Sequence, residues 1–270
     1  MPASLDQILA SARQKLASRR ASLDIRQLER NAEKHVPRGF RHSLAMKSRD
    51  GTAIIAELKK ASPSRGLIRA NFDATLLARE LENAGAAALS VLTDEEFFQG
   101  SIENLQKASA ATRLPCLRKD FIFDEIQIIE ARANRADAVL LIAAALSQAE
   151  LLRLAQCARN FGLDVLCEVH DRDELQRALD AGFDLIGVNS RDLRTFKVDL
   201  QTAFRLAVEI PETVVRVAES GIRNGNDLAK LCAAGYHAFL IGESLMSQES
   251  PGQTLRTLLS DSAISLRTGH

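Results

Sequence analysis

Short apolar runs alternate with longer amphipathic stretches through most of this chain. From residue 53 onward, eight runs have the length and apolar content of buried β-strands. They cover residues 53–58, 87–92, 114–117, 136–143, 164–169, 185–189, 213–218 and 238–242. Because most of these runs are continuously apolar, they indicate strands that are buried on both faces, as in a parallel sheet covered by helices.

The stretches between these runs have the spacing of amphipathic helices. Clear examples are residues 73–84, 125–134, 148–161, 172–181 and 226–234. Several stretches end at a glycine, the usual residue at a helix C-terminus: Gly85, Gly162, Gly182 and Gly235. Eight such repeats predict an α/β protein that is a closed (β/α)8 TIM barrel. A doubly wound open sheet is the main alternative, but no G-x-G-x-x-G follows the first strand.

The first 48 residues have a different pattern. They are polar and rich in arginine, and Leu5, Ile8, Leu9 and Ala12 share one face of a helical pattern. We predict a solvated helical extension over residues 1–48, with a basic arm for an anionic partner as the alternative. Residues 49–270 are predicted to form the barrel. No Pro- or Gly-rich linker interrupts residues 53–245, which favours one domain overall.

Composition narrows the class of protein. The 35 basic and 35 acidic residues balance, which argues against a nucleic-acid or membrane surface. No apolar run approaches the ~20 residues that span a bilayer, and the N-terminus lacks a signal pattern. The four cysteines show no C-x-x-C spacing, so neither a zinc site nor a disulfide framework is predicted. We therefore expect a soluble, cytoplasmic protein without a bound metal.

Several apolar runs end in charged or polar residues. Side chains alternate between the two faces of a strand, so Glu57 and Lys59 share the face of Ile55. The same alternation sends further side chains inward: Lys119, Glu168, Asn189 and Arg191. Burying such groups is costly unless they face a site, and the open carboxyl end of a barrel provides one. There, carboxylates would keep the lysines protonated while burial lowers their pKa, which suits a general acid.

The last two strands are followed by candidate phosphate-binding loops. Gly221 and Gly242 allow close backbone approach, and loops seven and eight of such barrels often bind phosphate. Ser62 and Lys59 could add a hydroxyl and a charge. The Glu243 carboxylate must point away from the phosphate, which leaves its backbone N–H available.

Three other features receive a structural interpretation. Glu219 and Ser220 cannot both face inward, so one of them lies in the turn after the seventh strand. Ser220 is then a candidate for hydrogen bonding to the substrate. His170 precedes a helix-start pattern, so we prefer a capping or structural role for it. Phe97 and Phe98 follow a polar loop and are interpreted as packing beneath it, with a lid as the alternative.

Long segments of the chain resemble the indole-3-glycerol phosphate synthase family. They include the segments from Ile55 to Ile68, Leu117 to Phe121, Cys167 to His170, Ala218 to Ile222 and Leu240 to Met246. The likeness extends from the N-terminal extension to about residue 250. Two departures are mild: Ser190 stands where the family often has Asn, and Arg65 where Lys is common.

The resemblance implies a carboxy-lyase of tryptophan biosynthesis, with the N-terminal extension across the barrel mouth. The implied substrate is 1-(2-carboxyphenylamino)-1-deoxyribulose 5-phosphate, and no metal or organic cofactor is implied. Lys119 would be the general acid. Lys59, Glu57 and Glu168 would share the other proton transfers, supported by Asn189 and Ser220. The remaining positions would contact the substrate or hold its phosphate: Ser62, Phe121, Leu140, Arg191, Glu219, Gly221, Gly242, Glu243 and Ser244.

Other interpretations stay open at this point. The chain could be another phosphate-binding barrel, such as a sugar-phosphate isomerase or an aldolase with Lys59 or Lys119 as its Schiff-base residue. A barrel that only binds a phosphorylated ligand is disfavoured, because buried charges without chemical use cost stability. The extension could instead anchor a partner protein. For assembly we expect a monomer or a weak homodimer, with a small phosphorylated molecule as the ligand.

Overall fold

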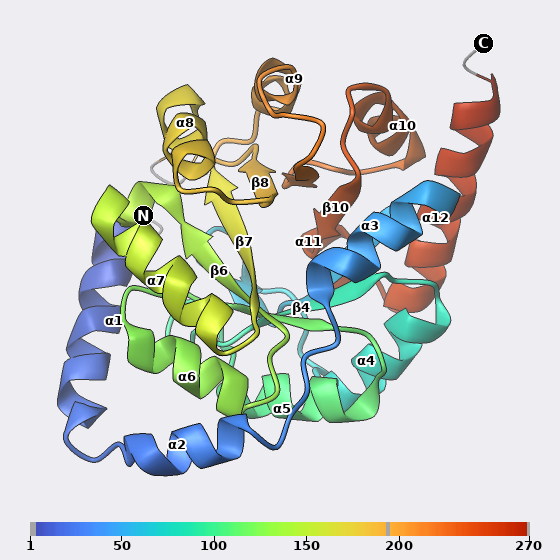
Figure 1. The fold of residues 1–270 in the computed structure, drawn as a ribbon. Helices are drawn as coiled ribbons and strands as arrows, with labels where there is room; N and C mark the ends of the chain where they lie inside the picture. The colour runs from blue at the N-terminus through green and yellow to red at the C-terminus, as the bar shows by residue number, and fades with distance from the viewer. Residues whose placement is uncertain (1–3, 193–194, 269–270) are drawn as a thin grey trace.

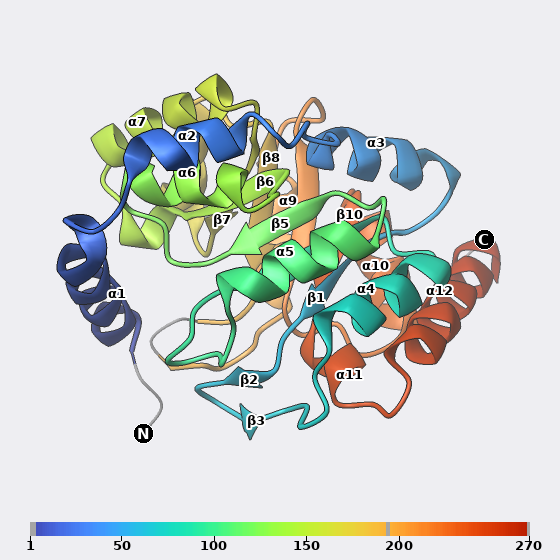
Figure 2. The ribbon, with the colours of Figure 1, turned by 90° about the horizontal axis from the view of Figure 1, so that it is seen from below.

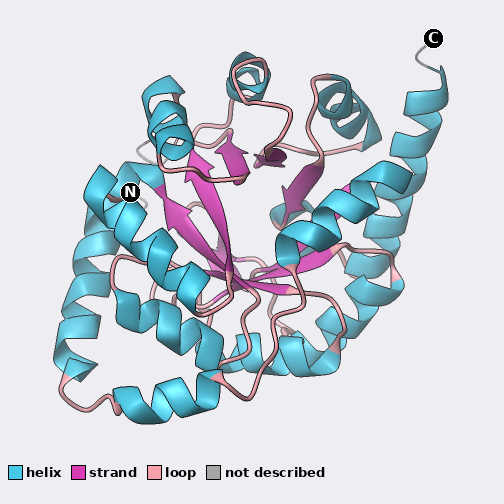
Figure 3. Cartoon of the chain, viewed as in Figure 1, coloured by secondary structure: helices cyan, strands magenta, loops and turns pink. Residues whose placement is uncertain are grey.

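Eight parallel strands close into a barrel, which confirms the predicted (β/α)8 architecture (Figure 3). The computed structural model describes residues 4–192 and 195–268. Each barrel strand pairs with the next one along the chain, and the last pairs with the first. The strands are β1 (Ala53–Leu58), β4 (Ala88–Leu92), β5 (Cys116–Lys119), β6 (Ala138–Ile142), β7 (Asp164–Val169), β8 (Leu185–Asn189), β9 (Val215–Glu219) and β10 (Ala238–Ile241).

Helices surround the barrel and return the chain from each strand to the next (Figure 1). They are α4 (Ala74–Asn83), α5 (Ile102–Ala111), α6 (Glu125–Ala133), α7 (Gln148–Asn160), α8 (Arg172–Asp180), α9 (Gln201–Ala207), α10 (Gly225–Ala233) and α12 (Pro251–Thr268). A polar residue caps the start of six of them by accepting hydrogen bonds from first-turn N–H groups: Asp73, Ser101, Asp124, Ser147, Asp171 and Asn224. Sequence therefore sets where these helices begin.

Two apolar layers result from the alternation of side chains along the strands. Ile54, Ala56 and Leu58 pack outward against the helices. Ile55, in contrast, packs inside the barrel with residues from the other strands, among them Leu117. The alternation predicted from sequence is confirmed, and it fixes which polar side chains enter the interior.

Two strands continue further than the apolar pattern indicated. β5 extends through Lys119, which pairs in register with Leu92, and β9 extends through Glu219, which pairs with Leu240. The predicted apolar runs ended at residues 117 and 218. Backbone pairing continues regardless of the side-chain charge, so both charged groups are held by rigid sheet.

The three helices of the N-terminal extension lie in three different places. α1 (Leu5–Arg20) reaches the carboxyl end of the barrel, where Leu5 and Ile8 line the cavity described below. α2 (Ile25–Ala32) packs along α6. α3 (Phe40–Asp50) lies at the amino end, where Phe40 and Leu44 are buried in the interior cluster. Figure 2 shows α3 at the opposite end from the short hairpin β2 (Ala61–Ser62) and β3 (Gly66–Leu67).

A buried carboxylate anchors the extension to the barrel. Asp137, just before β6, is fully buried and accepts hydrogen bonds from the backbone N–H of Cys116 (2.6 Å) and of Arg38 (2.7 Å). The Arg38 guanidinium lies 2.6 Å from it and the His35 ring 3.0 Å. Burial alone would raise the pKa of Asp137, but these bonds outweigh it and hold the pKa below its usual value.

Within the described ranges, the helices are too short or too polar to cross a membrane.

We expect Asp137→Asn to destabilise the fold by about 3 kcal/mol, because it leaves the partly buried guanidinium of Arg38 without its carboxylate. The pKa of Asp137 is lower in the folded than in the unfolded protein. Its contribution to the free energy of unfolding is therefore fully present above the unfolded-state pKa of about 3.9, and it is lost as the pH falls through the folded-state pKa. Denaturant unfolding from pH 7 to pH 3 should show the difference between wild type and variant shrinking in acid. A difference that stays constant would contradict the assignment.

Candidate active site

A cavity of about 820 Å³ opens at the carboxyl ends of the strands. All of the predicted site residues border it: Glu57, Lys59, Ser62, Lys119, Phe121, Leu140, Glu168, Asn189, Arg191, Glu219, Ser220, Gly221, Gly242, Glu243 and Ser244. They come from loops and strands that are far apart in the sequence. The barrel therefore gathers these polar groups at one end, as the strand alternation requires.

Lys119 lies at the centre of a cluster of carboxylates. Its Nζ donates to Glu168 Oε2 at 2.9 Å and to Glu219 Oε2 at 3.0 Å. Burial by itself lowers the pKa of Lys119, but Glu168, Glu219 and Glu57 outweigh it and raise the pKa above its ordinary value. The sequence predicted that carboxylates keep this lysine protonated while burial lowers its pKa, and together the carboxylates have the larger effect. Lys119 is a firmly protonated ammonium.

Glu57 and Lys59 form a second ion pair at the end of β1. Their charged atoms lie 2.5 Å apart, and Glu57 is only 3% exposed. Gly242 makes room for this carboxylate, because a Cβ at Gly242 would lie 2.3 Å from Glu57 Oε1. Sequence reasoning assigned Gly242 to the approach of a phosphate. The structure gives it a further role, which is to admit the Glu57 side chain.

Glu219 enters the cavity as the third carboxylate. It is 1% exposed, and its Oε1 has no hydrogen-bond partner among the described residues. Burial raises the pKa of Glu219 to about 7, with the charge of Glu168 adding to the rise and Lys119 opposing it. Near neutral pH this carboxyl group is thus poised to accept or to donate a proton.

The turn after β9 separates Glu219 from Ser220. Glu219 faces inward and Ser220 occupies the turn with φ of 66°, which confirms the prediction that only one of them faces inward. A left-handed conformation is uncommon for a residue other than glycine, asparagine or aspartate and is often found at functional sites. Asn189, at the end of β8, accepts from the backbone N–H of Arg191 at 3.0 Å. Its side chain is thereby fixed at the cavity wall.

Two arginines converge on Glu243 at the start of α11 (Glu243–Met246). Arg65 Nε lies 2.7 Å from Glu243 Oε1, and Arg191 Nη2 lies 3.5 Å from Oε2. Sequence reasoning missed Arg65 as a site residue, although the first loop already carried Ser62. The three side chains form a charged rim beside the loops after β9 and β10.

The opposite part of the cavity is apolar. Phe121 and Phe98 have ring centroids 6.2 Å apart, and both rings border the cavity with Leu140. Phe98 had been interpreted as packing beneath its loop or as a lid. Asp94 could have indicated from sequence that Phe98 belongs to the site. Its carboxylate accepts hydrogen bonds from the backbone N–H groups of Phe97 and Phe98 and so shapes that loop.

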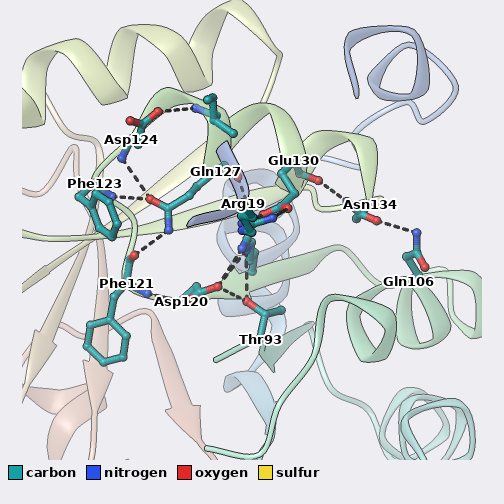
Figure 4. A network of polar contacts seen from close by, with 12 residues as sticks. Arg19, Thr93, Gln106, Asp120, Phe121, Phe123, Asp124, Gln127, Glu130 and Asn134 are labelled. Atoms are coloured by element: carbon teal, nitrogen blue, oxygen red, sulfur yellow. Dashed lines mark hydrogen bonds and ion pairs between the residues drawn. The ribbon is translucent and has the colours of Figure 1, made fainter. Parts of the chain in front are cut away.

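An outward-facing network holds the segment that carries Lys119 and Phe121 (Figure 4). Arg118 is 4% exposed, and its guanidinium lies 2.9 Å from both Asp120 Oδ2 and Glu130 Oε2. Asp120 also accepts from Thr93 at 2.5 Å. Further contacts extend the network to α1 and to the following loop: Arg19 to Glu130, and Gln127 to the carbonyl of Phe121. This network limits movement of the strand end.

His170 borders the charged cluster; the sequence allowed a place at the rim beside Glu168, although a capping or structural role was preferred. Its ring lies 3.4 Å from Glu168 and 3.0 Å from Glu174. Among the described residues, His, Cys, Asp and Glu side chains form no group able to hold a metal ion.

Lysines and buried carboxylates at the mouth of a (β/α)8 barrel are typical of a barrel enzyme, and these groups are of the kind that acid–base catalysis uses. The family model described as indole-3-glycerol phosphate synthase matches residues 5–258, and the chain belongs to that family. An indole-3-glycerol phosphate synthase of Koribacter versatilis is 58% identical over 259 residues, which cover 96% of this chain and all of that protein.

Solved structures share the fold at much lower identity. A thiamine phosphate pyrophosphorylase from Pyrococcus furiosus has a TM-score of 0.61 and 17% identity, covering 82% of this chain and 99% of its own. A 3-hexulose-6-phosphate synthase has a TM-score of 0.61 and 13% identity, covering 78% of this chain and 99% of its own. At these identities the likeness concerns the fold alone.

Gly187 should be essential for the position of Glu219. A Cβ there would lie 2.1 Å from Glu219 Oε1 and 3.2 Å from Leu166 Cδ1. We expect Gly187→Ala to push Glu219 away from Lys119 and to lower kcat by about 10²-fold, as for a misplaced catalytic group. Gly51→Ala is the matched control, since a Cβ at Gly51 meets nothing within 4 Å. Wild-type turnover in a folded Gly187→Ala protein would show that this placement does not matter.

Proposed function

We propose that this chain closes the indole ring of 1-(2-carboxyphenylamino)-1-deoxyribulose 5-phosphate, with release of carbon dioxide and water. The observation that carries the proposal is Lys119, an ammonium held by Glu168 and Glu219 inside a cavity that is charged on one side and apolar on the other. Family membership supports the same reaction.

The cavity offers complementary surroundings for the two ends of this substrate. The aromatic ring would lie between Phe121, Phe98 and Leu140, where it displaces water from apolar surface. The phosphate would lie at the loops after β9 and β10, near Gly221 and the N–H groups of Glu243 and Ser244, with Ser62 and Lys59 alongside. The contact between Arg191 and Glu243 favours the phosphate side for Arg191.

The first chemical step would join two carbons. The ring carbon that carries the carboxylate attacks the C2 carbonyl of the sugar, while Lys119 donates a proton to the carbonyl oxygen. The new hydroxyl group remains on the sugar carbon. Carbon dioxide then leaves with cleavage of the ring–carboxylate bond, and its electron pair restores the aromatic ring. An ammonium aimed at the developing alkoxide is the form of stabilisation that contributes most in such sites.

The second stage would remove water. An acid protonates the hydroxyl group, and a base removes a proton from the neighbouring C1 carbon, which forms the double bond of the indole. Glu57, Lys59 and Glu168 are positioned for these transfers. Glu219, whose pKa is about 7, would hydrogen-bond the substrate through its unpartnered Oε1. Asn189 and Ser220 would orient the sugar hydroxyl groups.

A Schiff-base aldolase would need an unprotonated lysine as nucleophile. The raised pKa of Lys119 works against that role, because its amine is protonated throughout the physiological range. Borohydride reduction in the presence of the proposed substrate should therefore leave the protein mass unchanged. A covalent adduct on Lys119 or Lys59 would favour the aldolase interpretation.

The direct test is to mix the purified protein with the carboxyphenylamino ribulose phosphate. Indole fluorescence should rise with time, accompanied by an equal amount of carbon dioxide. No fluorescence change at high enzyme concentration would contradict the proposed reaction.

Replacing the general acid should slow chemistry more than it weakens binding. We expect Lys119→Ala to lower kcat by ~10²–10⁴-fold, the usual contribution of general acid catalysis, with a much smaller change in KM. Lys107→Ala, on the exposed face of α5, is the control and should match wild type. If the Lys119 variant turned over within a few-fold of wild type, Lys119 would not be the acid.

A further inference from the structure

His170 lies directly behind the catalytic carboxylate of Glu168. It follows β7 at the start of α8, and its side chain is 13% exposed. Its Nε2 lies 3.4 Å from Glu168 Oε1, and its Nδ1 lies 3.0 Å from Glu174 Oε2. Each ring nitrogen therefore faces a different carboxylate.

This geometry favours a positively charged ring: Nδ1 is hydrogen-bonded to Glu174, and Nε2 lies at ion-pair distance from Glu168 without a hydrogen bond. A neutral imidazole carries one N–H group, so one of its nitrogens would present a lone pair to a carboxylate oxygen. Only the imidazolium has an N–H on both sides. Glu174 is itself held in place, because it also accepts from the backbone N–H of His170 at 2.8 Å. The pKa of His170 agrees: burial lowers it, but Glu168 and Glu174 outweigh burial and raise it to about 10.

Glu168 is consequently held between two cations from different elements. Its Oε2 accepts from Lys119 on β5, and its Oε1 faces His170 on the opposite side. Two further carboxylates, Glu57 and Glu219, act on the same lysine. Burial alone would raise the pKa of Glu168, yet Lys119 and His170 together lower it below its ordinary value.

We propose that His170 is a positioning residue that acts through Glu168, keeping it ionised and oriented while Lys119 gives up its proton. The inference rests on the proposed function, in which Lys119 becomes neutral once it has protonated the carbonyl oxygen. At that moment His170 is the cation that remains beside Glu168. Without it, Glu168 would take up a proton before its own step and could no longer act as a base.

The test combines two variants that act on opposite limbs of the pH–rate profile. His170→Asn removes the charge, so the pKa of Glu168 rises and the acid limb of kcat moves to higher pH by about 1–3 units, the usual effect of one nearby opposite charge. Turnover then falls more at the acid end of the profile than at pH 8, with little change in KM. Glu174→Gln lowers the pKa of His170 instead, so the alkaline limb moves to lower pH.

The same substitution on the exposed His42, His42→Asn on α3, is the control and should leave both limbs unchanged. A folded His170→Asn protein whose acid limb matches wild type would overturn the proposal.

Nitrogen NMR of the wild-type protein without substrate measures the protonation of His170 directly. The result therefore depends neither on the folding of a variant nor on the proposed reaction. We expect both His170 nitrogens to carry protons from pH 6 to pH 8.5, and Glu174→Gln to bring the titration into that range. A neutral ring at pH 7 would overturn the inference. Failure of the wild type to form indole, with His170 still protonated, would instead overturn the proposed function alone.

Discussion

The structure depends on holding two ammonium groups and three carboxylates inside the end of an apolar barrel. Charges removed from water are stable only when each has a partner with good geometry. Lys119 obtains two carboxylate oxygens at hydrogen-bond distance, and Glu57 obtains Lys59. Burial raises the pKa of Glu219 to about 7, and the charge of Glu168 adds to the rise. The charged cluster is thus stabilised by its ion pairs, and it contains one carboxyl group, Glu219, that can exchange a proton near neutral pH.

Space for these charges comes from glycines inside the barrel. Gly187 lies where Glu219 turns inward, and Gly242 lies where Glu57 does. A side chain in place of either glycine would occupy the position of the carboxylate. Each of these glutamates therefore depends on a glycine that leaves space for its carboxylate. Replacing the glycine would displace the glutamate side chain.

Sequence reasoning predicted the parts of this arrangement that follow from periodicity. Alternation along β1, β5 and β7 predicts that Glu57, Lys119 and Glu168 lie on the inner face. It could not predict features that depend on contacts distant in sequence. The pairing of Gly187 with Glu219 is of this kind, as is the burial of Phe40 from α3 in the amino end of the barrel. The contribution of Glu219 to the raised pKa of Lys119 was not predicted, because the sequence left open which of Glu219 and Ser220 faces inward.

The outer layer of polar contacts explains how the inner cluster keeps its geometry. Lys119 and Arg118 are adjacent on β5 and point in opposite directions, so one faces the cavity and the other the helices. Arg118 ties that strand end to Asp120 and to Glu130 on α6, which also binds Arg19 from α1. Glu168 lies on the inner face of β7, His170 follows that strand, and α8 holds His170 through Glu174. Helices on the outside thus fix the inner charges through short chains of buried ion pairs. A change in the helical layer that leaves the barrel intact should therefore affect proton transfer before it affects substrate binding.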